Sequence, residues 1–210
     1  SADHGIVFKR TDVSDDHAYV NASFENVSKT YLRTQLTNSF GVSIITAEHI
    51  LAAFAGLGIH NALVELSEAE VPIFDGSSRV FVKAILESGV NELNKKIKLY
   101  QVVNSIRVGS SNAWAELRPA KTFSIDFEMN WPGTALSKQS LDMPIVNGAF
   151  VREICDSSYQ HGEGMMSPPV LFLLGIIVVN SKCFLVRGHI DSQARLSRDC
   201  LVRVNIYVHF

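Results

Sequence analysis

The chain has little of what marks secreted, disulfide-stabilised or nucleic-acid-binding proteins. Its three cysteines, Cys155, Cys183 and Cys200, are odd in number, far apart and without a Cys-x-x-Cys pair. This usage favours reduced thiols in a cytoplasmic protein over a disulfide framework or a cysteine zinc site. Nineteen Lys and Arg against 21 Asp and Glu give a formal net charge of −2. The charge balance therefore gives no electrostatic reason to expect nucleic acid as a partner.

Long hydrophobic runs are also missing. The best candidate, Val170–Val179, has ten residues and is followed by the polar Asn180-Ser-Lys182. Such a run is too short to cross a bilayer and is more typical of one or two buried strands, so we expect no transmembrane segment. The first residues, Ser-Ala-Asp-His-Gly, carry no basic stretch leading into an apolar one, which predicts no signal peptide.

The most informative segment that is present runs from Thr46 to Leu66 and contains an adjacent Glu48–His49 pair. Apolar residues recur around the pair at helical spacing and predict a buried stripe: Ile50, Leu51, Phe54 and Leu57. The residues that follow Glu48 and His49 on the same helix faces are only Ala or Gly. These small side chains predict open space in front of both polar side chains. A carboxylate beside an imidazole with room in front of both suits a divalent metal and its activated water.

Structural explanations for the same pair stay open on spacing alone. Glu48 lies in the first helical turn, where the macrodipole favours an acidic residue. No Lys or Arg occurs between Arg33 and Arg79, so no basic residue near in sequence explains the carboxylate. His49 could equally be a half-buried histidine bonded to a backbone carbonyl. A single Glu-His dipeptide does not decide between these explanations.

Local patterns predict strands and helices that are segregated within each half of the chain, which favours an α+β fold. The expected strands are 5–9, 31–36, 43–45, 59–66, 99–108, 113–118 and 122–127. The expected helices run from about Ala47 to Gly56, from Ser77 or Ser78 to Ser88, and over 147–155. The polar stretch 91–98 is the natural linker, and 210 residues allow one domain or two small ones.

Two motifs carry a specific family resemblance. The helix Thr46-Ala-Glu-His-Ile-Leu-Ala-Ala-Phe-Ala-Gly-Leu-Gly58 and the loop Glu70-Val-Pro-Ile-Phe-Asp-Gly-Ser-Ser78 closely resemble the zinc-dependent UDP-3-O-acyl-N-acetylglucosamine deacetylases, which catalyse the committed step of lipid A synthesis in Gram-negative bacteria. Further similar segments are His4–Asp12, Trp114–Pro119, Phe123–Phe127 and Gly148–Ile154. The resemblance runs in register from about residue 3 to Ser157.

The resemblance implies a two-domain α+β sandwich. Each domain would be a mainly antiparallel sheet with helices on one face, and these helices would pack between the domains. Residues 1–96 would form the first domain, and residues 97–210 a partial second domain, in which 158–210 diverge from the family. By resemblance, His49 would be a zinc ligand and Glu48 the general base that hydrolyses the N-acetyl group of UDP-3-O-acyl-N-acetylglucosamine.

Both ends depart from the family pattern. Family members have a further strand hairpin before the position of Asp3. After Ser157 they continue with Arg-Thr-Phe-Gly and a His-x-x-x-Asp helix that supplies two more zinc ligands, whereas none of the seven histidines here precedes an Asp by four residues. We therefore expect an apparently truncated chain with an incomplete zinc site and a tail foreign to the fold. Two hypotheses follow: a zinc amidase, or a non-catalytic remnant that at most binds a nucleotide sugar or a protein partner.

Overall fold

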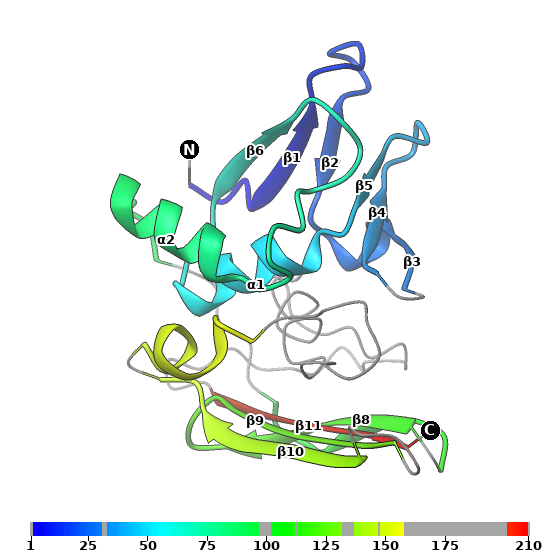
Figure 1. Cartoon of the computed structure of the whole chain (residues 1–210), viewed down its shortest axis with the longest axis vertical. Helices are drawn as coiled ribbons and strands as arrows, with labels where there is room; N and C mark the ends of the chain where they lie inside the picture. Colours follow the sequence, from blue (N-terminus) through cyan, green and yellow to red (C-terminus); the bar gives the residue numbers. More distant parts are fainter. Residues whose placement is uncertain are drawn as a thin grey trace.

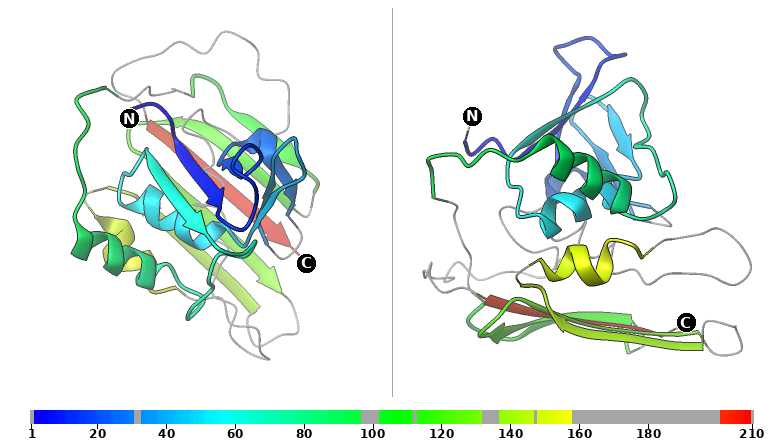
Figure 2. Two further views of the ribbon diagram at one scale, coloured as in Figure 1. Left: turned by 90° about the horizontal axis from the view of Figure 1, so that it is seen from above. Right: turned by 60° about the vertical axis from the view of Figure 1, so that its left-hand side comes forward.

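The computed structural model describes residues 2–30, 33–96, 102–111, 113–131, 137–146, 148–157 and 201–209. They form a mixed α+β fold, as the sequence patterns predict. Two three-stranded sheets lie on one side of a layer of helices, and a five-stranded sheet lies on the other (Figure 1). The same layering is seen when the molecule is turned (Figure 2). The helices thus lie inside, between the sheets, while the domain boundary near residue 96 stays a prediction.

The two small sheets are built from the first 66 residues. One has the order β2-β1-β6, in which β1 pairs antiparallel with β2 and parallel with β6. The other has the order β3-β4-β5 and is antiparallel throughout. In chain order the strands are β1 Ile6–Arg10, β2 Tyr19–Asn21, β3 Val27–Lys29, β4 Gln35–Thr37, β5 Ser43–Ile45 and β6 Ala62–Leu66. A short 3₁₀ turn, η1 Phe24–Asn26, lies between β2 and β3.

Three helical segments form the central layer. Helix α1 spans Glu48–Gly56 and α2 spans Arg79–Ser88. A single π-helical turn, η2 Phe150–Ile154, lies within the segment 147–155 that the sequence predicts to be helical. Gly58 and Gly89 follow α1 and α2 with φ of 68° and 79°, a left-handed conformation that only glycine adopts without strain. Both helix ends are therefore where the glycines predict them.

The large sheet has the order β10-β9-β11-β8-β7. Its strands are β7 Ile106–Gly109, β8 Ala113–Ala120, β9 Ser124–Trp131, β10 Ser137–Pro144 and β11 Leu201–His209. The central strand, β11, pairs antiparallel with β8 and parallel with β9.

The position of β11 corrects the expectation that the whole of 158–210 is foreign to the fold. Residues 201–209 read Leu-Val-Arg-Val-Asn-Ile-Tyr-Val-His, and this run of β-branched and aromatic residues has high strand propensity. They complete the sheet by filling the place between β8 and β9. The apolar run 170–179, for which we expect one or two strands, lies outside the described residues.

Several strands begin later than their sequence patterns predict. The strand expected over 31–36 begins at Gln35, the one over 59–66 begins at Ala62, and of 99–108 only Ile106 onward is described as strand. The sequence patterns do not predict β2, β3 or β10.

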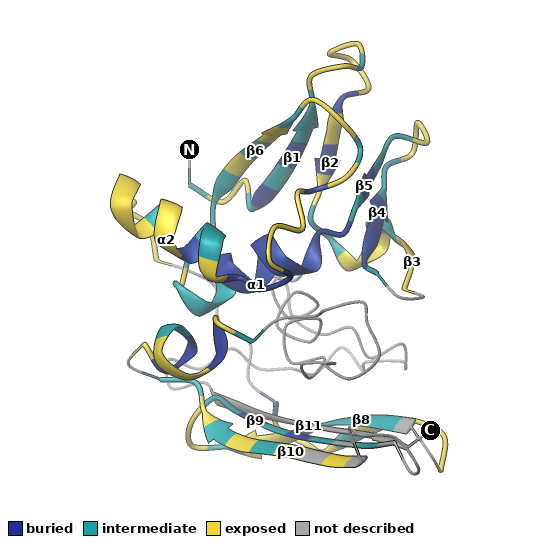
Figure 3. Ribbon diagram, viewed as in Figure 1, coloured by how far each residue is buried: buried dark blue, intermediate teal, exposed yellow. Residues whose placement is uncertain are grey.

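Two hydrophobic clusters pack on opposite sides of the helices (Figure 3). The first lies between α1 and the small sheets and includes Phe8, Leu36 and Leu51, all fully buried. The second lies between the helices and the large sheet and includes Phe127 and Phe150. Helix α1 contributes to both clusters, so it is buried on two sides. Among the described residues, no helix is long and apolar enough to span a membrane.

Candidate functional site

Glu48 and His49 lie in the first turn of α1, as predicted, but their surroundings differ from the prediction. Their relative exposures are 7% and 3%, so neither side chain looks out over open space. The small residues on their stripes are covered instead: Ala52 and Ala53 belong to the cluster that contains Phe150. The sequence shows that these stripes carry only small side chains, but it does not show which element packs against them. That element is η2, almost one hundred residues further along the chain.

Glu48 is held by a backbone donor rather than by a cation. Its Oε2 accepts a hydrogen bond from the backbone N–H of Thr34 at 2.9 Å. Burial raises the pKa of Glu48 above its ordinary value, and the Thr34 N–H opposes this rise. The carboxylate is therefore a stronger base than an exposed glutamate and is fixed in direction.

His49 is the other notable group. Its Nδ1 is buried and has no hydrogen-bond partner among the described residues, so no backbone carbonyl in this part of the chain anchors the ring there. Burial lowers the pKa of His49, while the nearby Asp75 carboxylate raises it in part. The imidazole is therefore neutral at pH 7, which is the form that binds metals. A buried ring nitrogen without a partner is unusual and suits a metal ligand.

One histidine does not close a zinc site. Catalytic zinc takes three protein ligands and leaves one position for water or substrate. Within the part of the chain that the structure describes, no three His, Cys, Asp or Glu side chains come together as a metal-binding group. His49 thus fits the role of one ligand, and further ligands would have to come from outside the described residues. His189 and Asp191, which lie close together in the sequence, are both outside the described residues.

The loop before α2 fixes the position of α1. Ser78 is fully buried, and its hydroxyl donates to the backbone carbonyl of His49 at 2.9 Å. Its backbone N–H donates to the carbonyl of Cys155 at 3.1 Å. Ser77, rather than Ser78, accepts from the first backbone N–H of α2, that of Arg79, at 3.1 Å. Ser78 therefore links the starts of α1 and α2 to the end of η2.

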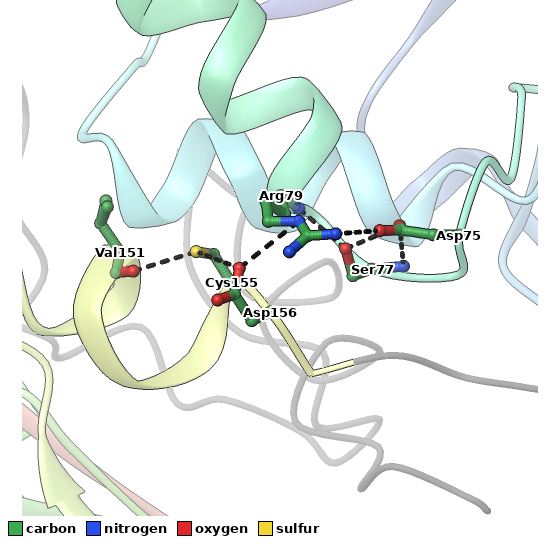
Figure 4. Close-up of polar contacts among 6 residues, drawn as sticks. All are labelled: Asp75, Ser77, Arg79, Val151, Cys155 and Asp156. Atoms are coloured by element: carbon green, nitrogen blue, oxygen red, sulfur yellow. Dashed lines mark hydrogen bonds and ion pairs between the residues drawn. The ribbon is translucent and has the colours of Figure 1, made fainter.

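Charged side chains surround this junction (Figure 4). Asp75 Oδ1 accepts from both the backbone N–H and the hydroxyl of Ser77, at 3.0 and 2.7 Å. Arg79 contacts Asp75 at 3.2 Å and Asp156 at 3.8 Å. These contacts lower the pKa of Asp75, with the Ser77 hydroxyl contributing most. Cys155 donates to the Val151 carbonyl within η2, and burial raises the pKa of its thiol, which argues against a reactive cysteine.

Sequence reasoning missed Thr34 and Ser78 as parts of the site. Thr34 acts through its backbone N–H, which any residue except proline has, so its residue type carries no signal. Ser78 appeared only as a possible helix cap. The signal that could have suggested its place is the second motif itself, because a loop shared with the family and lying next to the Glu-His helix would be expected to support it.

Residues 1–159 match the family model described as UDP-3-O-acyl N-acetylglycosamine deacetylase. Curated proteins named UDP-3-O-acyl-N-acetylglucosamine deacetylase are similar to the chain. The one from Blochmanniella pennsylvanica is 39% identical over 156 residues, which are 73% of this chain and 52% of the relative. The one from Shewanella frigidimarina is 40% identical over 152 residues, 71% of this chain and 49% of the relative. The chain spans about half the length of the curated relatives it matches.

Proposed function

Because the chain belongs to the UDP-3-O-acyl-N-acetylglucosamine deacetylase family, we propose that it acts in zinc-dependent hydrolysis of the N-acetyl group of UDP-3-O-acyl-N-acetylglucosamine, the committed step of lipid A synthesis. The observation that carries the proposal is the buried Glu48–His49 pair at the start of α1, inside the stretch that matches the family. The family is enzymatic, and its substrate is a nucleotide sugar with an acyl chain. We place the reaction in the cytoplasm, where reduced thiols such as the free Cys155 persist.

In this proposal Glu48 is the general base. Burial raises the pKa of Glu48 and so brings this pKa closer to the operating pH. General acid–base catalysis is most effective when the two values are close. The carboxylate takes a proton from the attacking water, holds it as the tetrahedral intermediate forms, and passes it to the departing amine. The Thr34 N–H keeps Oε2 in one place during these transfers.

His49 holds the metal in this proposal. The buried, neutral imidazole offers Nδ1, which no other group in the described part of the chain hydrogen-bonds. Zinc, when bound, polarises the acetamide carbonyl and lowers the pKa of its bound water. The Ser78 hydroxyl fixes the backbone of His49 relative to the start of α2, so the imidazole ring has a fixed position in the site.

An acetate-release assay with the nucleotide sugar and added zinc tests the proposal, with zinc content measured on the same samples. Glu48→Gln should abolish turnover and keep the metal, whereas His49→Gln should lose both. Glu65→Gln, an exposed carboxylate on β6, is the matched control and should change neither. Equal loss of zinc in the Glu48 and His49 variants would contradict the assigned roles.

The second candidate is a non-catalytic family member that binds a nucleotide sugar or a protein partner. The specific observation in its favour is that no group of three or more potential ligand side chains forms around His49 among the described residues. Under this alternative the chain would bind the nucleotide sugar but release no acetate at saturating zinc. Acetate release that depends on Glu48 would exclude it.

A further inference from the structure

Thr46, two residues before Glu48, has an unfavourable backbone conformation. Its φ is 60°, in the left-handed region that β-branched residues avoid. The residue is also buried, with a relative exposure of 6%. Strained residues of this kind persist only where their surroundings hold them, and they cluster at functional sites. Thr46 is where the chain turns from β5 into α1, so its conformation sets the direction in which α1 starts.

Glu70 holds Thr46 in this conformation. The Thr46 hydroxyl donates to Glu70 Oε1 at 2.7 Å. The backbone is tied at the same point, because Ile45 forms a parallel bridge with Glu70. The Ile45 N–H donates to the Ala69 carbonyl at 2.8 Å, and the Val71 N–H donates to the Ile45 carbonyl at 3.0 Å. The first residues of the two family motifs, Thr46 and Glu70, are thus joined directly.

A second pair of hydrogen bonds connects this turn to the Glu48 carboxylate. The Ala47 N–H donates to the Thr34 carbonyl at 3.2 Å, and the Thr34 N–H donates to Glu48 Oε2 at 2.9 Å. Thr34 therefore meets both the residue after Thr46 and the carboxylate itself. If the turn at Thr46 relaxed, Ala47 and Glu48 would move together relative to Thr34, and the carboxylate would lose its donor.

We propose that Glu70 is a positioning residue for Glu48: it holds Thr46 in its left-handed conformation and so aims the Glu48 carboxylate at the Thr34 N–H. The catalytic meaning of this role rests on the proposed function. The positioning itself does not, because every contact involved lies within residues 34–71. Glu70 also acts on Glu48 through its charge, which adds to the rise in the pKa of that carboxyl group.

Amide hydrogen exchange at Thr34, followed by NMR on the full chain, tests the positioning without reference to turnover. Glu70→Ala should speed exchange of the Thr34 amide by about tenfold or more, because the Thr46 turn relaxes. Adding Thr46→Gly to Glu70→Ala should restore slow exchange, because glycine adopts this φ without strain. Glu70→Gln keeps an oxygen acceptor for the Thr46 hydroxyl and should leave exchange slow, and Glu65→Ala is the exposed-carboxylate control.

Two results would overturn the inference. One is unchanged Thr34 exchange in Glu70→Ala, and the other is fast exchange that Thr46→Gly fails to restore. If exchange responds as expected but Glu48→Gln has no effect on acetate release, the proposed function fails while the positioning role stands.

Discussion

Two sheets of the molecule share one arrangement but complete it in different ways. In β2-β1-β6 and in β10-β9-β11, the middle strand has an antiparallel neighbour on one side and a parallel neighbour on the other. In the first sheet the parallel neighbour, β6, follows α1 closely in sequence. In the second it is β11, which begins 70 residues after the end of β9. The second sheet therefore depends on a remote segment, and closing such a long connection makes a sheet slow to form.

The helices differ in the same sense. Helix α1 carries the proposed catalytic pair, because it begins with Glu48 and His49. The turn η2 covers α1, because Phe150 is fully buried and lies directly against Gly56 at the end of that helix. A Cβ added at Gly56 would be 1.9 Å from Phe150 Cδ1. The first region thus contains the proposed catalytic pair, and η2 covers the helix that carries it.

Removing residues 201–210 should have the largest effect. The deletion takes away the central strand and leaves β8 and β9 each without one of its two neighbours. We expect the large sheet to unfold while β1–β6 and α1 keep their exchange protection. A milder version is Asn205→Pro, which removes one ladder donor and should cost about 1–3 kcal/mol, with Asn205→Ala as control. Intact protection of β8 and β9 after the deletion would show that β11 is dispensable.

The contact between α1 and η2 should give the next largest effect. Phe150→Ala should lower the free energy of unfolding by about 3–5 kcal/mol, because it leaves a cavity in a fully buried site. Gly56→Ala should cost about 1–3 kcal/mol through overpacking. In the Phe150→Ala background the same change should become neutral or stabilising, since alanine favours a helix by about 1 kcal/mol over glycine. Urea denaturation of the four proteins gives this cycle, and additive effects would contradict the direct contact.

The buried histidine should make stability depend on pH. Burial depresses the pKa of folded His49 below its ordinary 6.5. Between the two pKa values the unfolded chain binds the extra proton, so stability should fall as pH drops below about 6.5. The loss is about 1.4 kcal/mol for each unit of depression. His49→Gln should flatten this part of the curve. His60 is exposed, so His60→Gln serves as the comparison variant and should change the curve less than His49→Gln.

The ties between the two regions at α2 should give the smallest effects, and unequal ones. Ser78→Ala removes a buried hydrogen bond to the His49 carbonyl and should cost about 1 kcal/mol. Arg79→Gln removes contacts whose partners are largely exposed, so it should change stability by less than about 0.5 kcal/mol. Thermal melts of both variants test this order. A larger loss in Arg79→Gln would mean that the surface charges, not the Ser78 hydroxyl, are the stronger tie at this junction.

Local residue patterns predicted local structure well in this chain. The apolar stripe of α1 and the glycines after both helices gave their type and their ends correctly, because these signals come from neighbouring residues. The strand β11 and the cover provided by Phe150 could not be predicted in the same way. Each depends on a partner far along the chain, and an apolar residue does not show which surface it will cover. For the same reason, the sequence could not show that the space expected in front of Glu48 and His49 is filled by other residues.

Zinc binding followed at the His49 imidazole is the most direct test of the central claim, that His49 is a metal ligand and Glu48 its neighbouring base. Zinc added to ¹⁵N-histidine-labelled protein should shift or broaden the ring signals of His49, assigned with His49→Gln. The same response should persist in Glu48→Gln. Binding should be weak, because the described residues supply no group of three potential ligands around His49. No response at His49, or a response that disappears in Glu48→Gln, would contradict the account.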